Sequence, residues 1–320
     1  MRVIQRMSIC SVVLGLATPA MQVQADAGLN GYWSGGLEHD SNVTVDELNA
    51  SSGQSDEAWV LGAGLEGVLK PTKALNLTLG YDLSGRRYHN LDQFDQDIHL
   101  LSADLSYDFD PVTVGASYHY SYATLDSDRF LDFRRTSLYL GSLIGENVYL
   151  MASVQDKSKE FDAGTARDSD IRGGSFDAFF FFNQARSNLI LGVDLDDEDA
   201  RSDAYDNRLI RFRAALVHRF VLAGQDSRFR LSWRYEDQEY DEVVITVEDN
   251  RPLNDFLTRD LAERTGQRVD KSRVIEASWR LGLNEVFSLE PRVSYGHYTS
   301  TLDSADYDRW VAGVALRAGF

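Results

Sequence analysis

Histidines are the first side chains to test for catalysis, because imidazole is the usual general base near neutral pH. The chain has six: His39, His89, His99, His119, His218 and His297. None forms a His-x-Glu or His-Glu-x-x-His metal pattern, and no glycine-rich phosphate loop or dinucleotide fingerprint occurs. We therefore expect no enzyme activity and no cofactor. A hydrolase is the less favoured alternative, with His119 as its base and Asp82 or Asp104 orienting the ring.

Carboxylates are concentrated in one short stretch, Asp194–Asp199, with Asp203 and Asp206 following closely. Carboxylate oxygens suit hard cations such as calcium, but the spacing of an EF-hand is absent. We expect a solvated acidic loop there rather than a metal site. Divalent ions could still bridge such carboxylates to the phosphates of lipopolysaccharide.

The overall charge excludes one class of partner. Among 320 residues, 32 Lys and Arg stand against 50 Asp and Glu, which gives a formal charge of −18. Such a chain repels phosphate backbones, so nucleic acid is not an expected partner. The mean hydropathy is −0.33, and no run of about 18 apolar residues occurs, so a bundle of transmembrane helices is excluded.

The amino terminus has the three parts of a secretory signal peptide. Met1–Arg6 carries two arginines, Met7–Ala20 is mostly apolar or small, and Val23 and Ala25 are small residues before a cut at Asp26. We predict a signal peptide over residues 1–25 and one domain over residues 26–320. Cys10 is the only cysteine and leaves with the signal, so the mature chain has no disulfide and no thiolate metal site.

The rest of the chain alternates apolar and polar residues with a period of two. In Arg228–Tyr235 the odd positions are apolar or aromatic and the even positions are polar, and Leu75–Ser84 has the same pattern. A strand with this pattern has one apolar and one polar face. Fourteen strands are predicted: 29–38, 58–69, 74–86, 97–108, 112–122, 132–143, 147–156, 173–183, 188–196, 207–220, 227–239, 269–283, 286–299 and 307–320.

The connections between these segments are expected to alternate between long and short. The short ones include 70–73, 110–111, 145–146, 223–226 and 284–285, and the long ones 39–57, 87–96, 157–172, 197–206 and 240–268. An even strand number with this alternation is typical of a closed antiparallel β-barrel in a bacterial outer membrane, which has short periplasmic turns and long extracellular loops. A soluble β-sandwich is the alternative, but it would not require the alternation of loop length.

The carboxy-terminal strand supports the barrel. Trp310, Val314, Leu316 and Phe320 share one face, and the sequence given ends at Phe320. Outer-membrane barrels commonly end with an aromatic residue on such a strand. We therefore assign Phe320 as an assembly signal and expect the barrel assembly machinery, outer-membrane lipid and lipopolysaccharide as partners.

The polar faces of the strands predict the lining of the lumen. The first nine strands contribute an acidic arc. The later strands contribute an arc of arginines that also contains three carboxylates, Glu236, Glu276 and Glu290. The acidic arc comprises Glu38, Glu66, Asp82, Asp104, Asp108, Asp177 and Asp194. The basic arc comprises Arg211, Arg213, Arg219, Arg228, Arg230, Arg234, Arg280, Arg292, Arg309 and Arg317. The charges either pair across the interior and plug it, or set a transverse field across a wet passage.

Several short motifs resemble the barrel domain of the surface lipoprotein assembly modifier family: Gly36–Thr44 (GLEHDSNVT), Arg268–Asp270, Tyr307–Trp310 and the terminal Phe320. The resemblance implies a fourteen-stranded outer-membrane barrel that helps to move lipoproteins to the cell surface. Members of that family carry a helical tetratricopeptide-type domain before the barrel. Here only a few residues separate Asp26 from the first predicted strand.

We expect an outer-membrane barrel that passes a solute or a polypeptide such as a lipoprotein cargo, as a pore or an export conduit. The competing class is a non-conducting surface receptor or adhesin that uses the 240–268 loop.

Overall fold

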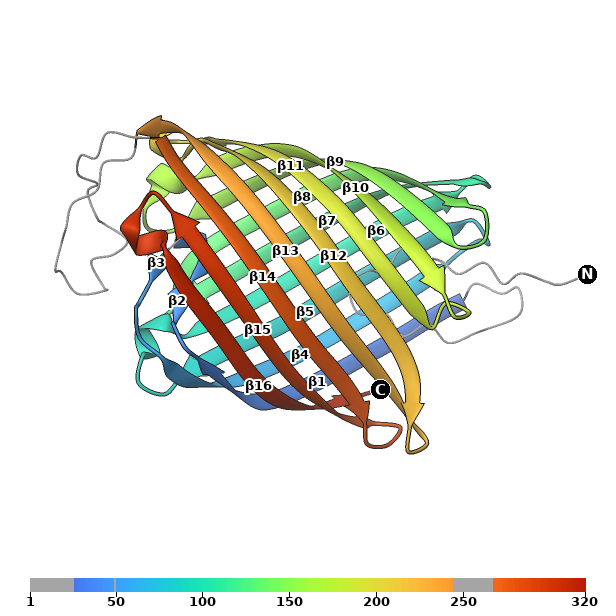
Figure 1. Ribbon diagram of the computed structural model, residues 1–320. Helices are drawn as coiled ribbons and strands as arrows, with labels where there is room; N and C mark the ends of the chain where they lie inside the picture. The colour runs from blue at the N-terminus through green and yellow to red at the C-terminus, as the bar shows by residue number, and fades with distance from the viewer. Residues whose placement is uncertain (1–25, 49, 244–266) are drawn as a thin grey trace, which may run out of the picture.

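The computed structural model describes residues 26–48, 50–243 and 267–320 and shows an all-β closed barrel (Figure 1). Around the ring, β1 is followed by β4 to β16 in chain order. The strands are β1 (Asp26–Asp40), β4 (Asp56–Lys70), β5 (Leu75–Tyr88), β6 (Gln96–Asp108), β7 (Val112–Leu125), β8 (Asp128–Ile144), β9 (Val148–Phe161), β10 (Ser169–Phe182), β11 (Ser187–Ala200), β12 (Asn207–Leu222), β13 (Gln225–Val243), β14 (Gln267–Gly282), β15 (Phe287–Ser300) and β16 (Tyr307–Gly319). The predicted fold class and all fourteen segments are confirmed.

The barrel closes where its first and last strands pair. β1 and β16 are antiparallel from Tyr32 opposite Gly319 to Asp40 opposite Val311. Beyond β16, Phe320 and Gly31 exchange two backbone hydrogen bonds of 2.9 Å each. Closure leaves no unpaired strand edge, which is the condition for a sheet to cross a bilayer.

The outer surface of the barrel is apolar. Trp59, Val154 and Phe320 expose 62%, 64% and 76% of their surface. They alternate along their strands with half-buried or buried inward residues. A closed barrel with an apolar skin is the architecture of a transmembrane outer-membrane protein. Among the described residues no helix is long and apolar enough to cross a membrane.

The strands extend further than their alternation indicates, so the loop pattern differs from the prediction. The β7–β8 connection lies on the side expected to carry long loops, yet it is only Asp126 and Ser127, at φ 52° and 66°. Two positive φ values fit a tight type I′ hairpin, which continues the strands without a loop. The prediction of strict alternation in loop length is therefore wrong at this connection.

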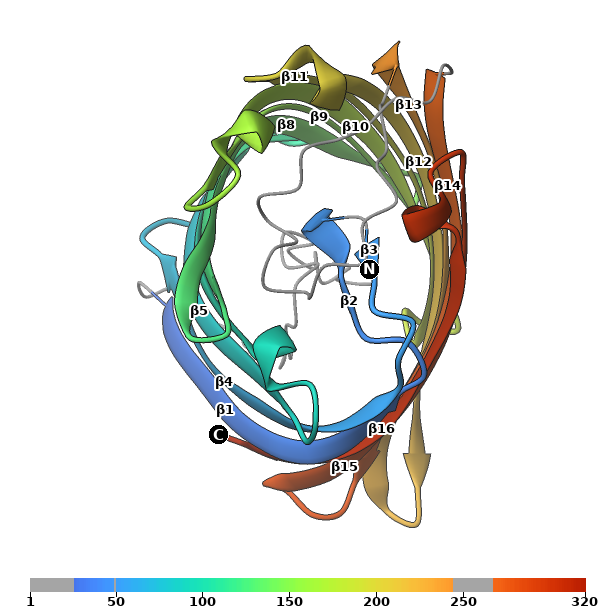
Figure 2. The same ribbon diagram turned by 90° about the vertical axis from the view of Figure 1, so that its left-hand side faces the viewer.

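The first long connection folds into the barrel. L1 (residues 41–48 and 50–55) contains a two-stranded sheet, β2 (Thr44–Val45) with β3 (Ala50–Ser51), and the 3-10 helix η1 (Asp46–Leu48). Figure 2, viewed from the end that carries the long connections, shows β2 and β3 inside the ring of strands. Following the topology of such barrels, we call this end the extracellular end. The opposite end, where β1 begins and β16 ends, is the periplasmic end.

L1 builds a hydrophobic core inside the extracellular mouth. Val43, Val45 and Leu48 are buried against residues from β4 to β9 and the loops between them. The other members of the cluster are Ala58, Tyr88, Leu91, Phe94, Phe130, Leu131 and Phe161. A transmembrane barrel does not need an internal apolar core for its strands to pair, so this cluster serves to hold L1.

Candidate pore and its constriction

The predicted lumen residues lie on the inward phase of their strands. Each stands at the opposite parity to most of the exposed apolar residues of its strand, the exceptions being Ile98 near the start of β6 and Val221 near the end of β12. Asp108 is the weakest assignment, because it is exposed at the periplasmic rim and its Oδ1 accepts the Asp110 N–H at 3.0 Å. Asp108 therefore shapes its own turn rather than lining the passage.

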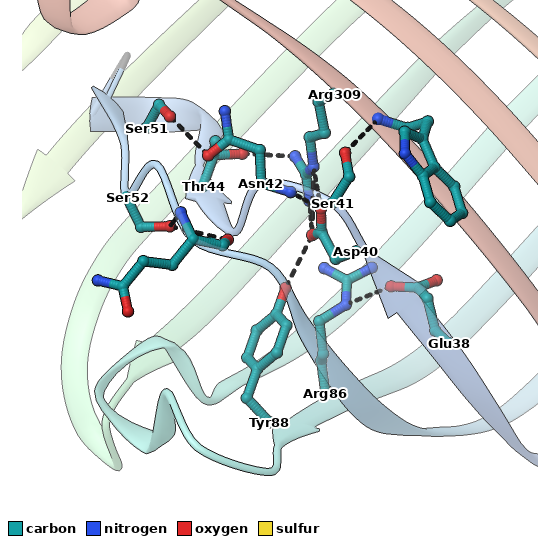
Figure 3. Close-up of polar contacts among 12 residues, drawn as sticks. Glu38, Asp40, Ser41, Asn42, Thr44, Ser51, Ser52, Arg86, Tyr88 and Arg309 are labelled. Carbon is teal, nitrogen blue, oxygen red and sulfur yellow. Dashed lines mark hydrogen bonds and ion pairs between the residues drawn. The ribbon is translucent and has the colours of Figure 1, made fainter.

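A buried ion pair joins β1 and β16 at the base of L1, and its arginine also donates a hydrogen bond to L1. The Asp40 carboxylate at the end of β1 is fully buried, and Arg309 of β16 reaches it at 2.7 Å through Nη2 and 3.0 Å through Nε. Tyr88 donates its hydroxyl to the same carboxylate at 3.2 Å, and Arg309 also donates to Thr44 Oγ1 within L1. Figure 3 shows these groups converging from β1, β5, β16 and L1. We call Asp40, Thr44, Tyr88 and Arg309 the latch.

Asn42 fixes the shape of L1 next to the latch. Its Oδ1 accepts hydrogen bonds from Ser51 Oγ at 2.6 Å and from the Gly53 N–H at 3.0 Å, which ties the two arms of L1 together (Figure 3). Its Nδ2 donates to the carbonyl of Asp308 on β16 at 3.3 Å. L1 therefore has a defined fold that is attached to the last strand as well as to the first.

The far end of L1 reaches the opposite side of the barrel. The Glu47 carbonyl accepts a hydrogen bond of 3.4 Å from Arg167, in the 3-10 helix η3 (Thr165–Arg167) between β9 and β10. β10 lies seven positions from β1 around the ring. β3 also contacts η6 (Asp303–Ala305), between β15 and β16. L1 thus crosses the mouth and narrows it.

Ion pairs bring together charges of the two predicted arcs, which is one of the two arrangements that the sequence left open. Glu38 is buried between Arg86 Nε at 2.9 Å and Arg292, so a carboxylate of the acidic arc is neutralised from both sides. Arg213 pairs with Asp177 at 3.0 Å and Asp194 at 2.7 Å. β16 neighbours β1 in the closed ring, and the staggered register brings charges of distant strands together. The arcs therefore meet and pair rather than facing each other throughout.

The acidic stretch that was predicted as a loop is part of β11. Its residues alternate, and Asp194, Asp196 and Glu198 face inward. Lys157 holds Asp196 at 2.7 Å, and Lys159 holds Glu198 at 2.8 Å. The solvated-loop prediction is wrong because β10 and β11 remain paired as far as Ser169 and Ala200. Among the described residues no group of three or more His, Cys, Asp or Glu side chains could hold a metal ion.

Hydroxyl groups satisfy further carboxylates of the lumen. Tyr32 donates to Asp82 at 2.9 Å, and Tyr139 donates to both oxygens of Asp104 at 3.0 Å. On the basic side, Arg211 pairs with Glu236, and Arg234 lies 3.5 Å from the same carboxylate. Sequence analysis missed Arg86, Lys157 and the tyrosines. The inward position of Arg86 could have been predicted from the sequence, because Arg86 has the same parity as Asp82 on β5.

The histidines do not form a catalytic arrangement in the described part of the chain. His119 faces inward, and its Nδ1 lies 3.3 Å from Arg135 Nη2, so the base–orienter pair of the less favoured hydrolase alternative is not formed with Asp82 or Asp104. His297 lies on the outer face and contacts Asp308 at 2.7 Å. His218 contacts Ser187 Oγ at 2.8 Å, also on the outer face, and Ser187 is 2% exposed and closed to a substrate.

Solved outer-membrane barrels share this fold. An outer-membrane protein of Vibrio cholerae, OmpT, has a TM-score of 0.50 at 9% identity, with 94% of this chain and all of that chain covered. An anion-selective porin from Comamonas acidovorans has a TM-score of 0.49 at 11% identity, covering 93% and 100%. CdiB from Acinetobacter baumannii has a TM-score of 0.45 at 11% identity, covering 91% of this chain and 60% of that one.

No protein-family model matches the sequence, and no curated protein sequence matches it. The likeness to solved structures at these identities extends to the fold alone. The chain is thus similar in fold to outer-membrane barrels, and its function has to be argued from its own lumen.

Proposed function

We propose that this protein is an outer-membrane pore for small solutes and that L1 constricts it. The observation that carries the proposal is the latch: a fully buried carboxylate and an arginine fix a folded loop across the mouth of a charged lumen. A structural barrel would have no need to shape its mouth in this way. Barrels of about eight strands are filled by side chains and those of about 16 to 18 leave a channel, so a fourteen-stranded barrel gains size selection from one inserted loop.

The charged lining supports passage of polar solutes. Ionic side chains on the wall of a narrow lumen hold water and set selectivity by the sign of their charge. We further propose that residues 1–25, which lie outside the described residues, are a cleaved signal peptide that directs export.

An export conduit related to surface lipoprotein assembly modifiers is the second candidate. The motif Gly36–Thr44 supports it, and that motif forms the end of β1 and the start of L1, including Asp40 and Thr44 of the latch. Constriction by L1 favours a small solute over a polypeptide. The adhesin alternative depends on the 240–268 loop, most of which lies outside the described residues.

The test is conductance of the refolded, purified protein in planar bilayers. The proposal predicts discrete steps of single-channel current. When Arg309→Gln releases L1, these steps should become larger or should no longer be interrupted by block of the channel. Absence of steps from preparations whose barrel is folded would refute the pore. Surface display of a co-expressed lipoprotein, lost on deleting the gene, would instead support export.

A further inference from the structure

The periplasmic half of the lumen contains five neighbouring arginines, of which only Arg280 and Arg317 have a carboxylate within 4 Å in the described part of the chain. Five inward side chains on β12, β13, β14 and β16, each a few residues from the periplasmic end of its strand, form what we call the arginine cluster: Arg219, Arg228, Arg230, Arg280 and Arg317. Elsewhere the lumen arginines of the basic arc have carboxylate partners, as at Arg213, Arg292 and Arg309.

Strand register places members of the cluster directly beside each other. Arg219 stands opposite Arg228, and Arg228 stands opposite Arg280. Like charges opposite each other on neighbouring strands destabilise a sheet. Arg228 is accordingly repelled by Arg219, Arg280 and Arg230. This repulsion is present at one height along the barrel axis, on the three consecutive strands β12, β13 and β14.

Two carboxylates of the neighbouring strands lie next to the cluster, Glu290 on β15 and Glu276 on β14, which is two residues from the Ser278 opposite Arg230. Glu290 pairs with Arg280, and its Oε1 also lies 3.9 Å from Arg317 Nε. Arg317 in addition stacks 3.4 Å over the Tyr32 ring. Asp226 shares the inward phase of β13 but is exposed at the rim. Within the described residues no ion pair neutralises Arg219, Arg228 or Arg230.

A polar group without a partner lies beside the cluster. Asn188 of β11 is opposite Val217, two residues from Arg219 on the inward face. Its Oδ1 is buried and accepts no hydrogen bond within the described part of the chain. Since the two ends of an amide are exchanged by a simple flip, the same side chain can present its NH₂ group to an acceptor.

We propose that the arginine cluster is a binding site for small oxyanions, carboxylates or phosphates, in the lumen. Guanidinium groups bind both classes through paired N–H donors, and adjacent guanidiniums that repel each other are stabilised by an anion between them. Arg219, Arg228 and Arg280 supply the row of donors, and Asn188 adds a neutral one. A role of this site in transport rests on the proposed pore function, whereas binding of an anion at the site does not depend on it.

Equilibrium binding tests the site without requiring conductance. The whole mature barrel in detergent micelles is titrated calorimetrically with inorganic phosphate and, separately, with succinate. The variant Arg219→Gln/Arg228→Gln/Arg280→Gln should bind at least about tenfold more weakly, because each lost guanidinium removes a charge-assisted pair. Arg273→Gln is the control for loss of an arginine outside the lumen: it removes one positive charge from the outer face, where Arg273 lies 5.8 Å from the Tyr235 ring centroid.

The outcomes separate the two proposals. Saturable binding of either anion by the wild type and Arg273→Gln, lost in the triple variant, supports the site, and the preferred anion identifies its class. Equal affinity in the triple variant, or no saturable binding in the wild type, overturns it. Gel migration of unheated samples checks that each variant is folded, which matters because the triple variant also removes the Arg280 partner of Glu290. If binding holds but bilayers show no conductance, only the pore fails.

Discussion

Arg309 is the residue whose loss should change the mouth of the barrel most. Its guanidinium contacts the buried Asp40 carboxylate through two nitrogens and also reaches Thr44. The variant Arg309→Gln leaves a fully buried carboxylate with only the Tyr88 hydroxyl and local backbone donors. Removing one partner of a buried ion pair costs about 3–5 kcal/mol.

That cost acts on L1 to the extent that L1 covers the carboxylate and accepts the Arg309–Thr44 hydrogen bond, since release of L1 would let water reach Asp40 while the β1–β16 backbone ladder stays intact. At about 1.4 kcal/mol per factor of ten, the ratio of docked to released L1 should fall by roughly 100-fold to 3,000-fold. Released L1 gives Asp40 access to water, which is how the variant relieves the unpaired charge. The channel should therefore show larger or noisier conductance than the wild type.

The assay is single-channel recording together with limited proteolysis of L1 in the folded barrel. A double variant, Asp40→Asn/Arg309→Gln, should recover part of the loss, since it removes the uncompensated charge. Arg273→Gln serves as the outer-face control. If Arg309→Gln matches the wild type in conductance, noise and proteolysis of L1, the latch does not hold the loop and the reasoning fails.

Three further variants probe other parts of the structure. Leu48→Ala should weaken L1 docking by about 2–5 kcal/mol because it opens a cavity in the mouth cluster, and faster proteolytic cleavage of L1 would show it. Arg213→Gln strips the cation from buried Asp177 and Asp194, so the free energy of unfolding in lipid vesicles should fall by about 3–5 kcal/mol; an unchanged value would mean that water already solvates these carboxylates. Val154→Arg places a charge on the lipid face at a side chain that is 64% exposed, and urea unfolding in vesicles should show a loss of about 2–4 kcal/mol, whereas no loss would contradict the assignment of the outer face.

The strands and their phase can be predicted because a bilayer forces one simple pattern on them. Leu231, Trp233 and Tyr235 alternate with polar residues since one face meets lipid and the other meets water. The same reasoning assigned Arg213 and Asp194 to the lumen, but it could not show that they pair. Pairing depends on the stagger between strands, and strand phase carries no information about stagger.

The ends of the strands and the fold of L1 could not be predicted for a different reason. Above the membrane both faces of a strand meet water or another loop, so the alternation weakens, and the predicted strand 188–196 ends before Glu198, which belongs to β11. Asp40 and Val43 lay in an expected loop, and only contacts with β16, β5 and the other loops make them a latch and a core. Such contacts are set by the closed ring, which the local pattern does not describe.

Recording from single molecules of the purified wild type in planar bilayers tests the central claim most directly. A lumen narrowed by L1 predicts discrete current steps whose size increases when Arg309 is replaced by Gln. Silent membranes from protein shown by gel migration to be folded, or steps of the same size in both proteins, would contradict the account.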